Sequence, residues 1–233
     1  MARKTKEDTA ATREGILDAA EQCFLQTGVS RATLEQIAAR AGYTRGAVYW
    51  HFKNKMEVLD AVIDRIQLPI FSGLDALGIA DDPQPLESLR QFHVHAFAEL
   101  ETNPHARVAT EITFLRCEYV EETAAILDRQ RRSTALALER VTATLRRAHE
   151  LRQLRADVDP PACALTLHFV IMGGLRAWVM SPHTIDLRRD VWAALEATLA
   201  SFTVAMPVPS RQARVKDVGS AARRRQPVRA ARR

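Results

Sequence analysis

The sequence predicts an all-α protein with a small N-terminal domain and a larger C-terminal one. Three observations lead to this fold class. Apolar residues recur at helical spacing along most of the chain, N-cap residues precede many of these segments, and no strand pattern of convincing length appears. With 233 residues, 47% of them hydrophobic, the chain is long enough for a small domain and a larger one, or for one sizeable core.

A short helix is expected directly after Thr33. Gln36 stands three residues beyond this threonine, which is the spacing of a capping box, and Gly42 occupies the place of a left-handed C-cap residue. The helix therefore spans about residues 34 to 41. One narrow apolar stripe runs along it, formed by Leu34, Ile37, Ala38 and Ala41.

A second short helix and the start of a third follow this glycine. Thr44 is the N-cap candidate of the second helix, and Asn54 with Glu57 repeats the N-cap and N3 pattern for the third. The second helix has two distinct faces. Its apolar face consists of Ala47, Val48 and Phe52, and its polar and aromatic face consists of Arg45, Tyr49, Trp50 and His51.

Two short helices around a glycine turn are typical of a helix-turn-helix, whose second helix lies in the major groove of DNA. Gly46 favours this interpretation, because glycine costs a helix about 1 kcal/mol relative to alanine but lets the backbone approach a phosphate or base. Arg45 is expected to pair with guanine. The helix start at Thr33 is expected to present N–H groups to phosphate, and Lys55 to anchor the DNA backbone.

The aromatic residues of the second helix fit the same interpretation. Tyr49 and His51 are suited to phosphates or base edges. The alternative is that the aromatic side chains of this helix all belong to the core. Val48 and Phe52 already supply a buried stripe at i, i+4, so Tyr49 and Trp50 cannot both point the same way.

These residues resemble the DNA-binding signature of the TetR/AcrR family of bacterial one-component repressors, over about residues 10 to 60. The phrase TRGAVYWHFKNK is similar to the branch that regulates multidrug efflux pumps. The resemblance implies a first helix that ends at Gly28 and packs through Ile16, Leu17, Ala20 and Phe24. It also implies that the positions that meet DNA are Thr33, Thr44, Arg45, Gly46, Tyr49, His51 and Lys55.

The rest of the chain is expected to form further helices. The first starts at about residue 55 and runs into the high seventies, with Pro69 as a candidate kink, and a loop follows from Gly78 to Pro85. The next helix is expected at about 86 to 101, and another follows Asn103 as N-cap with Pro104 at N1. A long helix is expected at 123 to 152. The last two are expected from Asp159-Pro160 to Ser181-Pro182 and, after Asp186, at 187 to 205.

The last two helices are unusually apolar for a chain end, which predicts a homodimer built as a four-helix bundle. A protein with one helix-turn-helix gains from dimerisation on a palindromic operator. The alternative is that both are ordinary core helices. The expected interface consists of Leu165, Leu167, Phe169, Ile171, Trp178, Val191, Trp192, Leu195, Leu199 and Phe202, with Gly173 and Gly174 permitting close approach.

The larger domain also combines apolar walls with a few polar side chains, which suits a ligand cavity and equally suits plain core. In the family that the chain resembles, a ligand cavity in these helices is the rule. The expected ligand-binding residues are Phe92, His93, Thr110, Glu111, Phe114, Met172 and Arg176.

Charge is unevenly distributed along the chain. Residues 1 to 55 carry a net +3, residues 56 to 206 a net −6 and residues 207 to 233 a net +8, which together give the overall +5. DNA affinity is therefore expected from the two ends. The last segment lacks apolar periodicity and is predicted to be a disordered basic tail, either a solvated end or a source of non-specific phosphate affinity.

The cellular context is expected to be the cytoplasm. Cys23, Cys117 and Cys163 are widely spaced, which favours reduced thiols over a disulfide framework or a zinc site. The first residues lack the apolar segment of a signal peptide. The most apolar run, residues 162 to 180, contains a glycine pair, a histidine and an arginine, so a buried helix is expected in place of a membrane span.

An enzyme is not expected. His93 and His95 are two residues apart on a helix and face about 200° apart, so they cannot bind one metal together. The sequence has no glycine-rich phosphate loop and no hydrolase or metalloprotease motif. No catalytic residue, metal site or cofactor is therefore predicted.

Together these features predict an all-α homodimeric repressor with an N-terminal three-helix helix-turn-helix domain and a larger C-terminal helical domain for ligand binding and dimerisation. The expected boundaries are residues 1–55, 56–206 and 207–233. A palindromic operator, a lipophilic small-molecule effector and a multidrug efflux operon as target are expected. The alternative is a constitutive or architectural DNA-binding protein with no effector.

Overall fold

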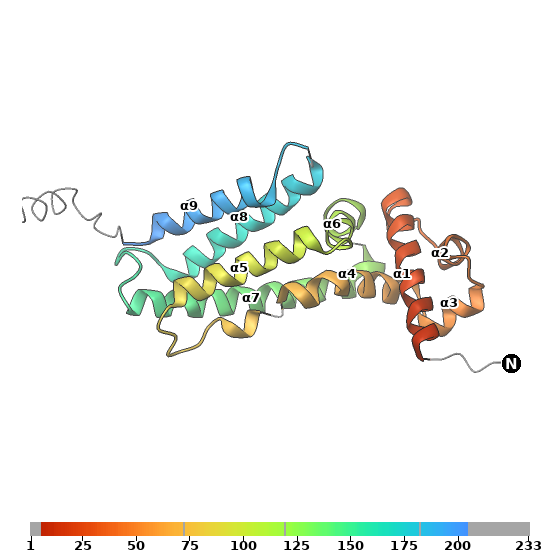
Figure 1. Cartoon of the computed structure of the whole chain (residues 1–233), viewed down its shortest axis with the longest axis horizontal. Helices are drawn as coiled ribbons and strands as arrows, with labels where there is room; N and C mark the ends of the chain where they lie inside the picture. Colours follow the sequence, from red (N-terminus) through yellow and green to blue (C-terminus); the bar gives the residue numbers. More distant parts are fainter. Residues whose placement is uncertain (1–5, 72, 119, 182, 205–233) are drawn as a thin grey trace, which may run out of the picture. The chain divides into compact units, whose positions relative to one another are not determined.

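The computed structural model describes residues 6–71, 73–118, 120–181 and 183–204, and the predicted tail, residues 207–233, lies outside this part. The all-α prediction is confirmed. Within the described residues the regular structure is helical, apart from an isolated bridge between Leu154 and Thr203. Figure 1 shows α1, α2 and α3 grouped together, with α4 leading from them to lie beside α5.

The first three helices are α1 (Lys6–Thr27), α2 (Leu34–Ala41) and α3 (Arg45–His51). The predicted capping box of α2 is confirmed: the Thr33 hydroxyl accepts from the Gln36 amide, and the Gln36 side chain accepts from the Thr33 amide. Gly42 adopts φ +71° at the end of α2, and Thr44 caps α3. The expected core face of α1 is buried and consists of Ile16, Leu17, Ala20 and Phe24.

Helix α4 (Lys55–Phe71) starts as predicted, because the Asn54 side chain accepts from the Glu57 amide at 2.9 Å. It ends earlier than predicted. A 3-10 turn, η1 (Leu74–Ala76), replaces its last part, since Leu74 and the following Leu77 are both buried by this change of direction. Tertiary packing has overridden the helical pattern at this point.

The next helices are α5 (Pro85–Thr102) and α6 (Ala106–Glu111), followed by a π-helix, η2 (Ile112–Arg116), and a 3-10 turn, η3 (Glu121–Thr123). The predicted start of α6 was wrong by two residues. The Asn103 side chain accepts from the His105 amide and donates to the Arg65 carbonyl oxygen, so it forms a turn before the helix in place of a cap.

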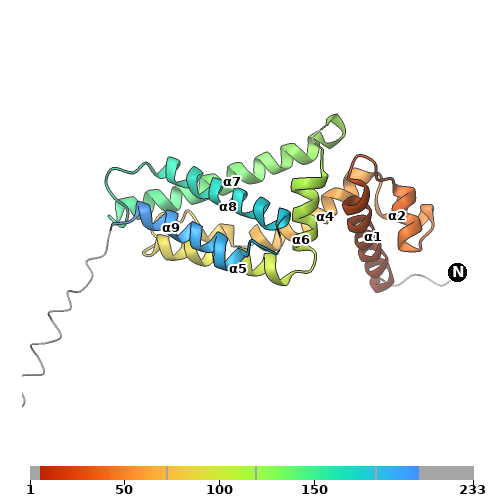
Figure 2. The same cartoon turned by 90° about the horizontal axis from the view of Figure 1, so that it is seen from above.

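The C-terminal helices are α7 (Ala124–Glu150), α8 (Pro160–Met180), a π-helical turn η4 (Leu187–Val191) and α9 (Trp192–Phe202). Asp159 and Asp186 cap their helices as predicted. Gly174 has a role within the chain, because a Cβ there would lie 2.4 Å from Cγ1 of Val191. Figure 2 shows α8 and α9 side by side above α5.

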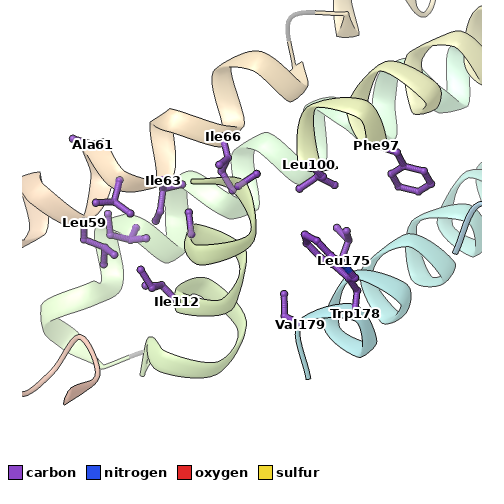
Figure 3. Packing of buried hydrophobic residues seen from close by; sticks show 14 of the residues in the cluster. Leu59, Ala61, Ile63, Ile66, Phe97, Leu100, Ile112, Leu175, Trp178 and Val179 are labelled. Atoms are coloured by element: carbon purple, nitrogen blue, oxygen red, sulfur yellow. The ribbon is translucent and has the colours of Figure 1, made fainter. Parts of the chain in front are cut away.

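One continuous apolar core connects these helices. In Figure 3, Leu59 and Ile63 of α4 face Ile112 at the end of α6, and Phe97 of α5 faces the side chains of α8. The chain through Thr203 forms one compact unit, and this core runs from the N-terminal helices into the C-terminal ones.

The predicted dimer interface is partly wrong, because several of its residues are core residues of a single chain. Burial within one chain leaves no surface for a partner. The buried ones are Leu167, Trp178, Val191, Leu195 and Leu199.

Helix α8 is less buried than predicted. It is the one helix of the described residues that is long and apolar enough to cross a membrane, and 28% of its most apolar window is buried in the chain. Its exposed side carries Leu165, Phe169 and Met180, with Phe169 63% exposed. This helix therefore has one core face and one exposed apolar face.

Candidate functional site

The exposed face of α3 presents two aromatic side chains. Tyr49 is 42% exposed and Trp50 is 71% exposed, whereas Val48 and Phe52 are buried. Sequence reasoning placed Trp50 on this face but did not count it among the DNA-contacting residues. Its exposure is the missing signal, because a tryptophan at a protein surface is available for apolar contact with a partner.

Arg45 is held in place at the start of α3. Its guanidinium lies 3.1 Å from the Glu35 carboxylate, donates to the Tyr49 hydroxyl at 3.3 Å and lies over the Tyr49 ring. The hydrogen bond to Tyr49 and the charge of Glu35 raise the pKa of Arg45. Its side chain is nevertheless 65% exposed. It is therefore charged and accessible, and a contact with a base would compete with Glu35.

Gly46 has no structural reason within the described chain to be glycine. A Cβ at this position would meet no atom within 4 Å, and its φ is not positive. Glycine in a helix nevertheless weakens it. The open space above Gly46 is therefore the place where a partner could approach the backbone closely.

Two further predicted residues lie beside this face. Thr44 uses its hydroxyl to cap α3, accepting from the Ala47 amide at 3.2 Å. The His51 ring contacts the Trp50 ring edge to face, with centroids 4.6 Å apart. Thr33 and Thr44 thus cap α2 and α3, two helices in contact, and Arg45, Gly46 and Tyr49 lie on α3.

Lys55 lies in a different environment from the one predicted. Its side chain is 13% exposed, and Nζ contacts the Ser30 carbonyl oxygen at 3.0 Å and the Glu122 carboxylate at 3.2 Å. These contacts join the start of α4 to the turn after α1 and to η3. A phosphate contact from Lys55 would have to break them.

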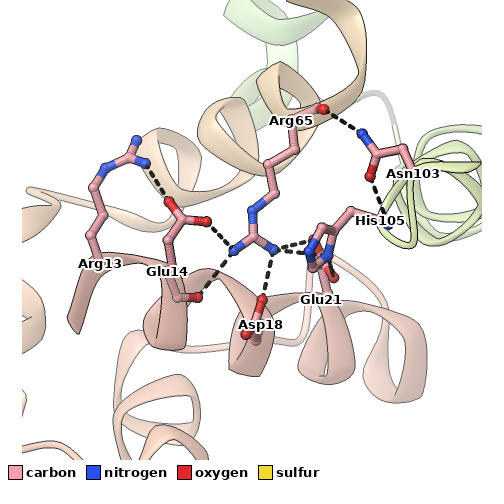
Figure 4. A network of polar contacts seen from close by, with 7 residues as sticks. All are labelled: Arg13, Glu14, Asp18, Glu21, Arg65, Asn103 and His105. Atoms are coloured by element: carbon pink, nitrogen blue, oxygen red, sulfur yellow. Dashed lines mark hydrogen bonds and ion pairs between the residues drawn. The ribbon is translucent and has the colours of Figure 1, made fainter. Parts of the chain in front are cut away.

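A second set of contacts links the helix-turn-helix to the rest of the chain around Arg65. Figure 4 shows its guanidinium between α1 and the turn before α6. It contacts Glu14 at 2.7 Å, Asp18 at 2.9 Å and Glu21 at 2.6 Å. The His105 ring lies 2.9 Å from Glu21 and 3.2 Å from Arg65.

The same cluster contains a possible metal-ligand set, since Asp18, Glu21 and His105 offer ligand atoms within 4.8 Å of one another. The Arg65 guanidinium contacts all three. A cation would compete with this charge. The cluster is therefore a structural junction between α1, α4 and α6.

An apolar cavity of about 150 Å³ lies between α5, α7 and α8. Phe92, His93 and Met172, three of the residues expected to bind a ligand, are among the residues that line it. Helix α7 contributes a wall that sequence reasoning missed, because small and aliphatic residues on an amphipathic helix give no signal for a cavity. The other lining residues are Ala96, Phe97, Leu100, Thr134, Ala137, Leu138, Val141, Ala164, Leu167, His168, Ile171 and Leu175.

The four remaining predicted ligand residues do not line this cavity. The Thr110 hydroxyl donates to the Ala106 carbonyl oxygen within α6, and Glu111 pairs with Arg116 at 3.5 Å. Arg176 is exposed and donates to the Phe114 carbonyl oxygen at 3.1 Å. We therefore do not assign ligand contacts to Thr110, Glu111, Phe114 and Arg176.

Two histidines are the titratable groups among the described lining residues. Burial lowers the pKa of His93 to about 4, and burial also lowers the pKa of His168. Both side chains are therefore favoured in their neutral form at neutral pH. The cavity combines aromatic and aliphatic walls with uncharged polar groups, the usual chemistry of a small-molecule site.

The chain matches two family models: bacterial regulatory proteins of the tetR family over residues 16–62, and the C-terminal region of MAATS-type transcriptional repressors over residues 84–204. It is 35% identical over 191 residues to the HTH-type transcriptional regulator AcrR of Shigella flexneri, covering 82% of this chain and 88% of that protein. The chain therefore belongs to the TetR family of bacterial transcriptional regulators.

Solved structures give the same result. The chain is similar to SmeT, the repressor of the Stenotrophomonas maltophilia multidrug efflux pump SmeDEF, in its triclosan complex, with 45% identity, a TM-score of 0.73, and coverage of 84% of this chain and 93% of SmeT. It is also similar to NalD, the secondary repressor of the MexAB-OprM multidrug efflux pump in Pseudomonas aeruginosa, with 33% identity, a TM-score of 0.76, and coverage of 86% and 100%.

Proposed function

We propose that this protein is a cytoplasmic, ligand-responsive repressor of a multidrug efflux operon, which leaves its operator when a lipophilic molecule occupies the cavity. The observation that carries this proposal is an apolar cavity between α5, α7 and α8 in a chain that also presents an exposed helix-turn-helix face. A ligand-responsive regulator needs both a DNA-contacting face and a ligand cavity, whereas catalysis requires neither an exposed helix-turn-helix face nor an apolar cavity.

The DNA-contacting surface is proposed to consist of the exposed face of α3 and the start of α2. Arg45 reads a base after leaving Glu35, and Gly46 lets the backbone approach the DNA. Trp50 adds apolar contact. The remaining contacts are assigned to Thr33, Thr44, Tyr49 and His51.

The functional form is proposed to be a homodimer on a palindromic operator. The exposed apolar side of α8, with Leu165, Phe169 and Met180, lies next to an exposed side of α9 made of small residues such as Ala193 and Ala197. Two such helix pairs can form a four-helix bundle between chains. Each half-site then meets one copy of α3.

Release of the operator is proposed to follow from a two-state equilibrium. The effector binds better to a conformer in which α4 has moved and the two α3 helices are wrongly spaced for DNA. The effector can then weaken operator binding by no more than the factor by which it prefers this conformer to the DNA-binding one. Arg65 and Lys55 join α4 to α1, to His105 before α6 and to η3, so movement of α4 is transmitted to the DNA-binding face.

The similarity to SmeT, which was solved with triclosan, supports a lipophilic effector. The alternative is a constitutive repressor in which the cavity is only a packing defect. The two accounts differ in whether an effector changes operator binding.

The test is an operator-binding titration. An operator is first selected from random double-stranded DNA with the purified full-length protein. Triclosan and a panel of lipophilic antibiotics are then added while fluorescence anisotropy reports bound DNA. We expect release at saturating effector, and no release would favour the constitutive repressor.

A matched pair of variants locates the effect. Ala137→Phe fills the cavity from α7, whereas Ala135→Phe places the same ring on the exposed side of that helix. Both variants should bind the operator, and only the cavity variant should lose release by effector. Equal behaviour of the two would place the effector elsewhere.

A further inference from the structure

The polar groups of the cavity restrict which molecules it can hold. The described lining contains three polar side chains, Thr134, His93 and His168, and none with a carboxylate, ammonium or guanidinium group. A charged ligand would lose its hydration without gaining an ionic partner, which is costly in an apolar site. The cavity walls therefore favour uncharged molecules.

The tautomer of His93 follows from its hydrogen bond. Its Nδ1 atom lies 2.8 Å from the carbonyl oxygen of Leu89. A carbonyl oxygen only accepts hydrogen bonds, so Nδ1 must carry a proton. Because burial holds the pKa of this imidazole at about 4, the ring has one proton at neutral pH and Nε2 has a free lone pair.

The Nε2 atom of His93 is an acceptor that a ligand in the cavity can use. His93 is 5% exposed and lines the cavity, and its hydrogen bond to Leu89 uses Nδ1. Within the part of the chain that the structure describes, Nε2 has no protein partner. A ligand that donates a hydrogen bond to Nε2 therefore gains affinity.

We infer that Nε2 of His93 accepts a hydrogen bond from the effector, and that the cavity selects uncharged aromatic molecules bearing a hydroxyl or N–H donor. This inference rests on the proposed function, since it assigns a chemical class to the effector of that site. Anions are disfavoured because the lone pair repels them, and cations because no carboxylate lines the described wall.

Three biphenyls of similar shape test this selection. 4-Phenylphenol carries a donor, 4-methoxybiphenyl lacks one, and 4-(aminomethyl)biphenyl is a cation at neutral pH. Isothermal titration of the full-length protein should show that the phenol binds roughly tenfold more tightly than the ether. The amine should bind more weakly than both.

Two leucine variants assign the preference to one histidine. In His93→Leu the phenol should lose roughly tenfold in affinity while the ether keeps its own, which removes the preference. His168→Leu changes the other histidine of the cavity and should keep the preference. A preference that survives in His93→Leu and disappears in His168→Leu would overturn the assignment.

Nitrogen-15 NMR of the wild-type histidine side chains gives an independent readout that needs no variant to fold. We expect His93 as the neutral tautomer with its proton on Nδ1, and a shift of Nε2 when 4-phenylphenol binds. A proton on Nε2 or a doubly protonated ring at pH 7 would refute the inference.

The outcomes separate the inference from the proposed function. If phenol and ether bind equally well and both release the operator, His93 does not select the effector, but the regulator stands. If none of the three binds, the inference fails. If in addition no lipophilic molecule of the wider panel releases the operator, the proposed function fails as well.

Discussion

The exposed face of α3 and the cavity between α5, α7 and α8 use similar side chains in opposite settings. Both contain a histidine and aromatic rings, but Trp50 is 71% exposed whereas His93 is 5% exposed. The α3 face is charged and is built by caps a few residues apart, while the cavity is uncharged and is assembled from three helices far apart in sequence. Residue types alone therefore do not distinguish a DNA-contacting surface from a ligand site.

The largest expected effect concerns the C-terminal helices, where core and surface alternate within one apolar pattern. Leu199 is 3% exposed and Phe169 is 63% exposed. Leu199→Asp should unfold the protein, with a loss above about 4 kcal/mol, because it buries a carboxylate without a partner. Phe169→Asp should leave the chain folded but monomeric, because it charges only the exposed side of α8.

Circular dichroism and light scattering distinguish these two results. A folded Phe169→Asp monomer should also lose operator binding, although α3 is untouched. A Phe169→Asp protein that stays dimeric would place the interface on another surface, and a folded Leu199→Asp dimer would contradict the core assignment.

The next effect concerns the junction between the two regions. Arg65→Met leaves the buried Glu21 carboxylate without its guanidinium partner, so unfolding free energy should fall by about 3 to 5 kcal/mol. Arg131→Met is the control, because it removes an ion pair with Asp128 in which both side chains are more than half exposed. Its cost should stay within about 0.5 kcal/mol, as measured by urea denaturation. Equal costs would show that the Arg65 cluster is not a structural junction.

A smaller effect is expected on the α3 face. Arg45→Ala should cost about 1 to 3 kcal/mol of operator affinity and relax preference at one base pair in each half-site. Glu35→Gln should strengthen binding slightly, since it removes the carboxylate that competes for Arg45. Competition binding with single-base operator variants measures both, and a uniform loss on all sequences would exclude base reading by Arg45.

Substitution of Lys55 is expected to have the smallest effect on operator binding. Because its Nζ is bonded to Ser30 and Glu122, Lys55→Ala should change the slope of log affinity against log salt by less than one per chain. A change of about one would instead identify Lys55 as the phosphate anchor that its sequence position suggested.

The helix-turn-helix could be predicted from sequence because its signals are local. The Thr33 and Gln36 pair, Gly42 and Thr44 lie within twelve residues and fix two helices without distant contacts. The environment of Lys55 could not be predicted, since Glu122 lies far along the chain. Trp50 was placed on the outer face of its helix from the sequence, whereas the extent of its exposure, 71%, depends on what the rest of the fold covers.

The cavity was only partly predictable because it depends on how three helices pack. Phe92, His93 and Met172 were identified from their types, whereas Arg176 faces outward and Thr110 bonds to its own helix. The interface prediction failed at Leu199 for the same reason. A helical apolar pattern shows that a face will be covered, but not whether the chain itself or a second copy covers it.

The most direct test of the account is reciprocal coupling between the two regions. Calorimetry measures triclosan affinity with and without the selected operator, and anisotropy measures operator affinity with and without saturating triclosan. Linkage requires the two ratios to be equal, and we expect each to show a weakening of about 5-fold to 150-fold. Triclosan affinity that is unchanged by operator DNA would contradict the claim that the cavity controls DNA binding.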